Sequence, residues 1–215
     1  MTPQEMYQAL RQANAATGCE TFDGHVLACI FSAAASESGN CGSLTNGLGI
    51  CGAALRSAIA RYFPGTLTQF ESLGLDTEPE VGEDELCLRE LLWRFRTAPS
   101  PLNSLMSLLI ARRSTRPNHL WQDLGLADRG ELSRLMQRHF WLLARRNSQD
   151  MKWKKFFYRM ICREDGFRMC VAPSCSECTD FDECFGDESG ESLLARVRLH
   201  GETPGLASIQ DARSL

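Results

Sequence analysis

Apolar residues recur at helical spacing along most of the chain, and no segment shows the strict alternation that is typical of a β-strand. Thr2, Pro3 and Glu5 form a capping-box pattern with proline at the first helical position, which predicts a helix that ends near Gly18. Further helices are expected over about residues 23–37, 53–62, 66–73, 86–95, 101–110, 129–140 and 150–163. The pattern therefore predicts an all-α fold.

Two stretches interrupt the helical pattern, a glycine-rich one at 38–52 and an acidic one at 77–84. We predict an interhelical loop at the first and a linker at the second, because their residues favour turns. The sequence GLGICG within the first stretch has the G-x-G spacing of a phosphate cradle. However, no strand precedes it and the lysine of a P-loop is absent, which argues against a nucleotide site.

The helix expected over 150–163 has an apolar face and a basic face, with Asn147 and Asp150 as predicted caps and Gly166 as its predicted end. Helical spacing directs one set of large apolar side chains toward the core, namely Trp153, Phe156, Phe157 and Met160. It directs the basic set toward solvent or toward the segment that follows, namely Lys152, Lys155, Arg159 and Arg163.

With 215 residues, 43% of them apolar, the chain can bury a core without help from a metal. We predict a single helical domain over 1–186, which includes an irregular loop at 166–186, and a mobile C-terminal tail over 187–215. The N-terminus lacks the features of a signal peptide, and no window is apolar enough for a membrane span. We therefore expect a cytoplasmic protein with no membrane partner.

Four cysteines lie close together near the C-terminal end in the order C-x4-C-x2-C-x5-C, namely Cys170, Cys175, Cys178 and Cys184. Turn-forming polar residues separate them, so the backbone can wrap an ion. Because thiolates are the preferred ligands of iron–sulfur clusters and soft metals, we predict that these cysteines bind such a centre. The first three match the spacing of plant-type ferredoxins, whereas the fourth follows much sooner. A four-thiolate zinc site or a disulfide pair stays open as an alternative, although zinc sites usually contain two close pairs.

The ten cysteines are not expected to form a disulfide framework in a reducing cytosol. Five of them lie in or beside helical segments at wide spacing, and we expect most of these to be small buried apolar residues: Cys19, Cys29, Cys41, Cys51 and Cys87. Cys162 lies on the last turn of the helix that enters the cysteine-rich loop. It is either a fifth thiol near the site or a packing residue.

His119 and His139 are candidates for a further ligand, although a core or surface role is more common for a lone histidine. The sequence contains no H-E-x-x-H, no G-x-S-x-G, no P-loop and no paired-carboxylate signature. We therefore expect that the protein is not an enzyme.

The formal net charge of −4 conceals an uneven distribution, because basic residues dominate 129–168 and acidic residues dominate 180–191. A basic surface attracts an anion, an acidic partner or the neighbouring acidic segment, or it is simply a solvated helix face. We expect no nucleic-acid partner.

Three blocks of sequence lead into the cysteine run: HLWQDLGL at 119–126, LMQRHF at 135–140 and, after Asn147, DMKWKKFFYR at 150–159. Together with the C-x4-C-x2-C-x5-C spacing they resemble the NifQ family, the molybdenum donors of nitrogenase cofactor assembly. The resemblance covers about residues 117–186. No motif in residues 1–117 contributes to it, so we expect that half to supply fold alone.

The resemblance implies that the protein holds a molybdenum–iron–sulfur cluster, composed of molybdenum, iron and sulfide. It further implies that molybdenum passes to the nitrogenase cofactor scaffold complex (NifEN) with participation of the nitrogenase iron protein (NifH), and that iron–sulfur and molybdenum donors load the carrier. Since molybdenum enters cells as an oxyanion, we also expect the basic helix from Lys152 to Arg163 to attract it.

Two other classes remain open at the level of the sequence. An iron–sulfur electron-transfer or redox-sensing protein would share the cysteine loop but would release no metal. A structural zinc-binding interaction module would contain no iron and would be colourless.

Overall fold

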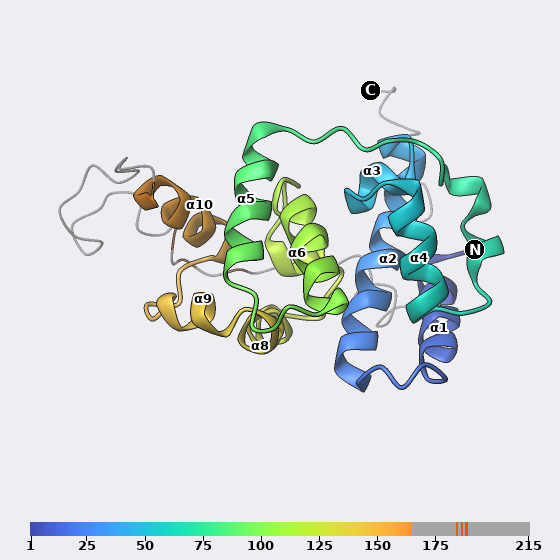
Figure 1. Cartoon of the computed structure of the whole chain (residues 1–215), viewed down its shortest axis with the longest axis horizontal. Coiled ribbons are helices and arrows are strands. Elements are labelled where there is room, and N and C mark those ends of the chain that lie inside the picture. Colours follow the sequence, from blue (N-terminus) through green and yellow to red (C-terminus); the bar gives the residue numbers. More distant parts are fainter. Residues whose placement is uncertain (165–183, 185, 187, 189–215) are drawn as a thin grey trace, which may run out of the picture.

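A computed structural model describes residues 1–164, 184, 186 and 188, and within these residues the regular structure is entirely helical (Figure 1). The helices before the acidic linker are α1 (Pro3–Asn14), α2 (Thr21–Cys41), α3 (Leu44–Leu48), α4 (Gly52–Tyr62) and the 3-10 turns η1 (Leu67–Gln69) and η2 (Glu71–Leu73). Those after it are α5 (Glu83–Arg94), α6 (Pro101–Ser114), α7 (Leu120–Asp123), α8 (Arg129–His139), α9 (Trp141–Arg146) and α10 (Trp153–Glu164). The predicted all-α class is confirmed for this part of the chain.

The helices form two groups that meet at α6. In Figure 1, α1 to α4 lie at one end of the molecule, α5 and α6 run side by side in the middle with α8 below them, and α9 and α10 lie at the other end. The long helix α2 packs against α1 and α3, α3 also packs against α6, and α10 packs against α5. One continuous hydrophobic core joins residues from α1 through α10. Within the described part, no helix is long and apolar enough to cross a bilayer.

Helix starts agree well with the local cap signals in the sequence. The Thr2 hydroxyl accepts a hydrogen bond from the Glu5 N–H at 3.2 Å, and the Thr2 N–H donates to the Glu5 carboxylate at 2.8 Å, which completes the predicted capping box. Ser100 caps α6 by accepting from the Asn103 N–H at 3.1 Å. Asp128 caps α8 by accepting from the Glu131 N–H at 2.9 Å. Each such cap contributes about 1 kcal/mol of helix stability.

The loop predicted over 38–52 is wrong, because α2 continues to Cys41 and α3 occupies part of the remainder. The Ser36 and Ser38 hydroxyls donate to carbonyl oxygens three residues earlier in α2, at 2.7 and 2.6 Å, so these serines do not end the helix. A side chain added at Gly47 would lie 3.2 Å from the Ala34 Cβ, and one at Gly52 would lie 2.1 Å from the Leu75 carbonyl oxygen. Gly47 and Gly52 therefore permit close packing, and the turns of this stretch lie around Gly42 and Gly49, which end α2 and α3 with positive φ.

Other element predictions also need correction. Residues 66–73 form the 3-10 turns η1 and η2 instead of one α-helix, and the short helices α7 and α9 were not predicted. Asn147 and Asp150 do not cap α10 as predicted. The Asn147 amide instead bonds to both backbone groups of Met151, at 2.8 and 2.9 Å, and Asp150 pairs with Arg129. These side chains shape the turn before α10.

The predicted core face of α10 is confirmed, because Trp153, Phe156, Phe157 and Met160 are all buried. Their aromatic rings pack edge-on or tilted, with centroids 5.8 to 6.3 Å apart. The predicted basic face is half-buried at Lys152, Lys155 and Arg159, not fully exposed.

Arg113 on α6 is a fully buried charge that joins three other elements. Its guanidinium donates to both Glu37 carboxylate oxygens, at 2.8 and 2.6 Å, to the Gly47 carbonyl at 3.4 Å and to the Asp123 carbonyl at 2.5 Å. A planar guanidinium has five N–H donors, so it can donate to several acceptors at once. Through this side chain, α6 is bonded to α2, α3 and α7.

Candidate metal-carrying site

The segment that carries the last predicted ligand returns to the start of α10. The Lys152 N–H donates to the Cys184 carbonyl at 2.8 Å, and Cys184 is half-buried against the core. The other three predicted ligands, Cys170, Cys175 and Cys178, lie outside the described residues. The four-cysteine site therefore stays a prediction, whereas the position of its last member is fixed by a backbone contact.

Cys162 lies at the other end of the same helix, half-buried on its last turn. At 1.5 Å of rise per residue, the ten positions between Lys152 and Cys162 separate their Cα atoms by about 15 Å along the axis. The chain thus leaves α10 at one end and has returned to its opposite end at Cys184.

Glu188 anchors the returning segment through two basic partners. Its carboxylate lies 2.7 Å from the Arg129 guanidinium and 3.8 Å from His119 Nδ1, and the side chain is only 7% exposed. Arg129 also donates to the Asp150 carboxylate at 2.9 Å and to the Met151 carbonyl at 3.1 Å. Burial lowers the pKa of Arg129, but the hydrogen bond to Asp150 and the charge of Glu188 together raise it by more.

Lys154, on the first turn of α10, is directed inward to α7. Its ammonium donates to the Asp123 carboxylate at 2.5 Å, to the Asn118 carbonyl at 2.6 Å and to the Arg116 carbonyl. Burial lowers the pKa of Lys154, and the contact with buried Asp123 offsets part of that shift. Together Lys152, Lys154, Arg129, Glu188 and Cys184 form what we call the α10 anchor.

His139 has a structural role. Its ring donates from Nε2 to Asp23 Oδ1 at 2.9 Å, and its Nδ1 shares a hydrogen bond with Asn103 Oδ1 at 2.8 Å. The Arg138 guanidinium donates to both oxygens of Asp23, at 2.6 and 3.0 Å. Burial raises the pKa of Asp23, but the hydrogen bonds from His139 and Arg138 lower it by more. We call these four residues the interior network, and it confirms the core role that is usual for a lone histidine.

His119 differs from His139 because its side chain is one-third exposed and lies beside Glu188. It stands at the N-terminal end of α7, where its N–H donates to the Gln122 side chain at 3.1 Å. His119 thus lies in contact with the returning segment. Among the described residues, however, no group of three or more His, Cys, Asp and Glu side chains could hold a metal ion.

With this geometry in view, comparison with known proteins settles the family. A sequence model of the NifQ family matches residues 26–186. This chain belongs to the NifQ family. It is 40% identical over 182 residues to the Protein NifQ homolog of Sinorhizobium fredii (strain NBRC 101917 / NGR234), an alignment that covers 84% of this chain and 79% of that protein. It is 39% identical over 148 residues to Protein NifQ of Rhodobacter capsulatus, covering 68% of this chain and 80% of that protein.

A third relative, Protein NifQ of Klebsiella pneumoniae, is 49% identical over 81 residues, which covers 37% of this chain and 48% of that protein. No solved structure matches the chain. NifQ membership confirms the resemblance predicted from the motifs, and it connects this chain to nitrogen fixation and molybdenum processing. The match also begins near the start of α2, so the family pattern includes much of the half in which no motif was found.

The remaining cysteines of this NifQ member are less buried than expected. Cys29 is buried, Cys19 and Cys51 are half-buried, and Cys87 is exposed on α5. Burial raises the pKa of the Cys19 thiol, so it is a poor thiolate at neutral pH. Cys87 is exposed but does not belong to the C-x4-C-x2-C-x5-C run, so it is a useful control for metal binding.

Glu188, Arg129 and Asp123 are the site residues that sequence reasoning missed. Glu188 falls in the segment predicted as a mobile tail, and Arg129 lies 59 positions before it, so no local pattern joins the two. Asp123 is within HLWQDLGL, one of the blocks that resemble the family, but nothing in that block indicates a bond to Lys154.

Proposed function

We propose that this NifQ member is a non-enzymatic cytoplasmic carrier that holds a molybdenum–iron–sulfur cluster and donates molybdenum for assembly of the nitrogenase iron–molybdenum cofactor. The cluster is its cargo. Its ligands are the thiolates of Cys170, Cys175, Cys178 and Cys184, and its recipient is the cofactor scaffold complex together with the nitrogenase iron protein.

The observation that carries this proposal is the position of the C-x4-C-x2-C-x5-C run, which lies inside the region matched by the NifQ family. Four thiolates at this spacing suit an iron–sulfur type of centre. A carrier needs both firm binding and release. Ligands drawn from one short stretch, and not from several buried helices, are consistent with both requirements.

The α10 anchor supports the same role. Cys184 is held through its backbone carbonyl, so the contact with Lys152 does not itself use the thiol. The ion pair of Arg129 with Glu188 and the backbone bond of Lys152 together hold the returning segment against the start of α10.

The test is elemental analysis of the full-length protein purified without oxygen. We expect molybdenum, iron and sulfide together, and we expect Cys170→Ser, Cys175→Ser, Cys178→Ser and Cys184→Ser each to remove most of the metal. Cys87→Ser and Cys51→Ser are matched controls that should retain it, because neither belongs to the chelating run.

Each alternative gives a distinct result. Iron and sulfide without molybdenum would favour an electron-transfer or redox-sensing protein, and zinc alone would favour a structural module. Equal metal loss in the control variants would overturn the ligand assignment. Transfer is measured separately by mixing the loaded protein with the scaffold complex and the iron protein and following molybdenum in the scaffold fraction. If no molybdenum leaves the carrier, the donor role is refuted.

A further inference from the structure

A cavity of about 490 Å³ lies between α9, the turn at 147–151 and α10. Three arginines from two helices line it, Arg145 and Arg146 of α9 and Arg159 of α10. The neutral polar side chains of Ser148 and Gln149 also line it, and Phe156 contributes an apolar wall. Within the described part of the chain, no acidic residue lines this cavity, which we call the arginine pocket.

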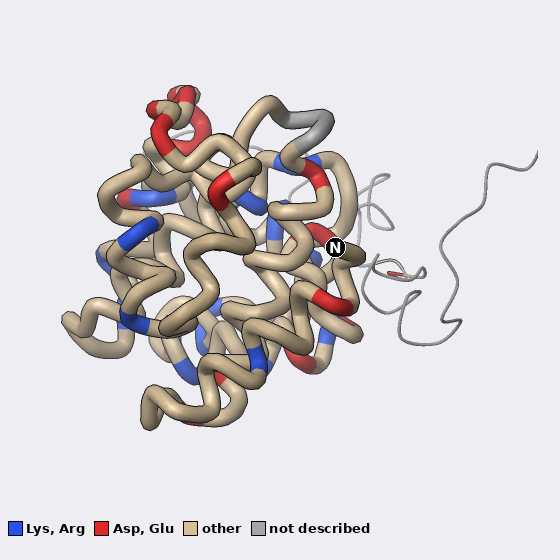
Figure 2. Tube along the Cα trace, turned by 90° about the vertical axis from the view of Figure 1, so that its right-hand side faces the viewer, with Lys and Arg blue, Asp and Glu red and all other residues tan. Residues whose placement is uncertain are grey.

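The charge of the arginine pocket is a local feature. Basic and acidic positions are both spread over the side of the molecule shown in Figure 2, and the chain as a whole has a net charge of −4. A second cavity, of about 410 Å³ beside α4, is lined by one arginine, Arg61, together with the acidic residue Glu20. The arginine pocket thus differs from this second cavity, which pairs its arginine with a carboxylate.

The nearest acidic residue along the chain is directed elsewhere. Asp150 has a left-handed backbone, with φ of 53°, and its carboxylate pairs with Arg129 on α8. The Asn147 amide closes the same turn by bonding to both backbone groups of Met151. This turn thus presents Ser148 and Gln149 to the cavity while it removes the negative charge of Asp150 from it.

The two arginines of α9 also have structural contacts. Arg145 and Arg146 lie in the last turn of α9, where a cation stabilises the helix C-terminus. They also lie over aromatic rings, Arg145 over Trp141 at 5.7 Å and Arg146 over Phe95 at 4.4 Å. Both still line the cavity, and Arg159 brings a third guanidinium to it from a different helix, α10.

We propose that the arginine pocket binds a tetrahedral oxyanion, and, resting on the function proposed above, that this anion is molybdate before it enters the cluster. Guanidinium groups bind such oxygens through charge-assisted hydrogen bonds, and the hydroxyl and amide of Ser148 and Gln149 add neutral donors. Arg159 precedes Cys162 by three residues, so both lie on one side of α10 in the turn that leads to the cysteine-rich segment. Met151, which lines the pocket, is adjacent to Lys152, so the pocket would hold molybdate beside the point where Cys184 contacts the start of α10.

The experiment is equilibrium dialysis of the full-length protein against isotopically enriched molybdate, so that newly bound molybdenum is distinguished from molybdenum carried from the cell. We expect saturable binding of one molybdate. The double variant Arg145→Gln with Arg159→Gln should bind at least about tenfold more weakly, since each loss removes a charge-assisted contact. Arg159→Lys, which keeps the charge, should retain part of the affinity.

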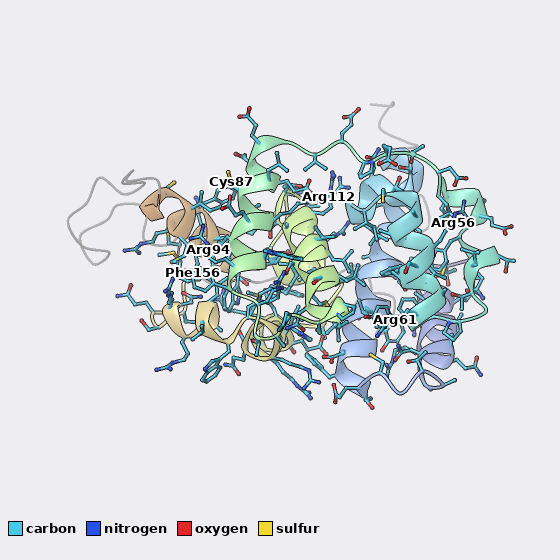
Figure 3. The ribbon with its side chains drawn as sticks, viewed as in Figure 1. Arg56, Arg61, Cys87, Arg94, Arg112 and Phe156 are labelled. Carbon is cyan, nitrogen blue, oxygen red and sulfur yellow. The ribbon has the colours of Figure 1, made fainter. Side chains whose placement is uncertain are left out.

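Arg61→Gln is the matched control. Arg61 is exposed and lies over the Tyr62 ring at 5.8 Å, as Arg145 lies over Trp141, and it lines the second cavity. Figure 3 shows Arg61 on α4 at one end of the molecule and Phe156, in the wall of the arginine pocket, at the other. Arg61→Gln should therefore bind molybdate like the unaltered protein. Circular dichroism melting of every variant separates loss of binding from loss of fold.

Three outcomes would overturn the proposal: no saturable molybdate binding, equal binding by the double variant and the unaltered protein, or complete displacement of molybdate by an equal concentration of sulfate. A double variant that binds molybdate normally but no longer accepts the scaffold complex would show that the pocket docks an acidic protein instead. Failure here is distinct from failure of the carrier role. If the unaltered protein holds and donates a molybdenum cluster but shows no saturable molybdate binding, the pocket alone is refuted. If it binds molybdate but assembles no cluster, the carrier role is refuted.

Discussion

The interior network contains a histidine and the α10 anchor lies beside one, but the two sets of charged side chains connect different parts of the molecule. The interior network joins helices that lie within the body, and Asp23, Asn103 and His139 are at most 6% exposed. The α10 anchor joins the body to a segment that returns from outside the described helices, and His119 beside it is one-third exposed. The difference shows that buried His139 is a structural residue, whereas the partly exposed His119 lies where the segment with Cys184 and Glu188 contacts the body.

Among the changes that test this comparison, removal of His139 should reduce the free energy of unfolding the most. In His139→Ala, Asn103 loses a buried partner and Asp23 keeps only Arg138. We expect the free energy of unfolding to fall by roughly 3 kcal/mol, because the truncation leaves buried polar groups short of hydrogen bonds and opens a cavity. Urea denaturation followed by circular dichroism measures this change.

His119→Ala is the control for that experiment, since the same residue type is removed from a partly exposed position. It should cost less than about 1 kcal/mol. If the two variants lose equal free energy of unfolding, His139 of the interior network stabilises the body no more than His119 beside the α10 anchor does.

The second-largest effect should come from acid, which weakens the interior network. Because the pKa of Asp23 is lower in the folded than in the unfolded protein, its contribution to stability is fully present above about pH 4, the ordinary value for aspartate. That contribution is lost as the pH falls through the lowered pKa. We expect the free energy of unfolding, measured between about pH 5 and pH 3, to fall less steeply in Asp23→Asn than in the unaltered protein.

Asp76→Asn provides the reference for the acid experiment, because the Asp76 side chain is 84% exposed although it pairs with Arg56. Its acid profile should match that of the unaltered protein. If Asp23→Asn also gives the unaltered profile, the pairing of Asp23 with His139 and Arg138 is not a source of acid sensitivity.

The smallest effect on global stability is expected in the α10 anchor. Glu188→Gln removes the charge that pairs with Arg129 and should change the free energy of unfolding by only about 1 kcal/mol. Locally, the Lys152 amide, which donates to the Cys184 carbonyl, should exchange its hydrogen severalfold faster. Hydrogen exchange resolved by NMR measures this directly.

Glu90→Gln breaks an exposed pair with Arg94 on α5 and should leave the Lys152 amide unchanged. Slow exchange at Lys152 in Glu188→Gln would show that the backbone contact with Cys184 persists without the ion pair.

Local signals predicted much of the fold, and long-range packing decided the rest. The caps at Thr2, Ser100 and Asp128 depend on residues three positions apart, so the sequence reveals them. The stretch at 38–52 was misread because its glycines and serines favour turns locally, whereas burial of α2 and its contact with α3 favour helix.

The candidate site likewise has a local part that the sequence predicted and a long-range part that it did not. The spacing of the four cysteines is a local pattern and was readable, and the family match includes it. The bond between Lys154 and Asp123 crosses 31 positions and the pair of Arg129 and Glu188 crosses 59, and no periodicity in the sequence relates such partners. Charge at Arg145 and Arg159 was visible in the sequence, but their convergence on one cavity required the fold.

Buried Arg113 makes the position of α10 depend on a helix of the N-terminal half. It is bonded to Glu37 of α2 and to the Asp123 carbonyl, and the Asp123 carboxylate is bonded to Lys154 of α10. A displacement of α10 would therefore have to break the bond between Lys154 and Asp123 or carry α7 and its bond to Arg113 with it. The position of α10, and of Cys184 in contact with its start, is thus set in part by α2, a helix that carries none of the predicted ligands.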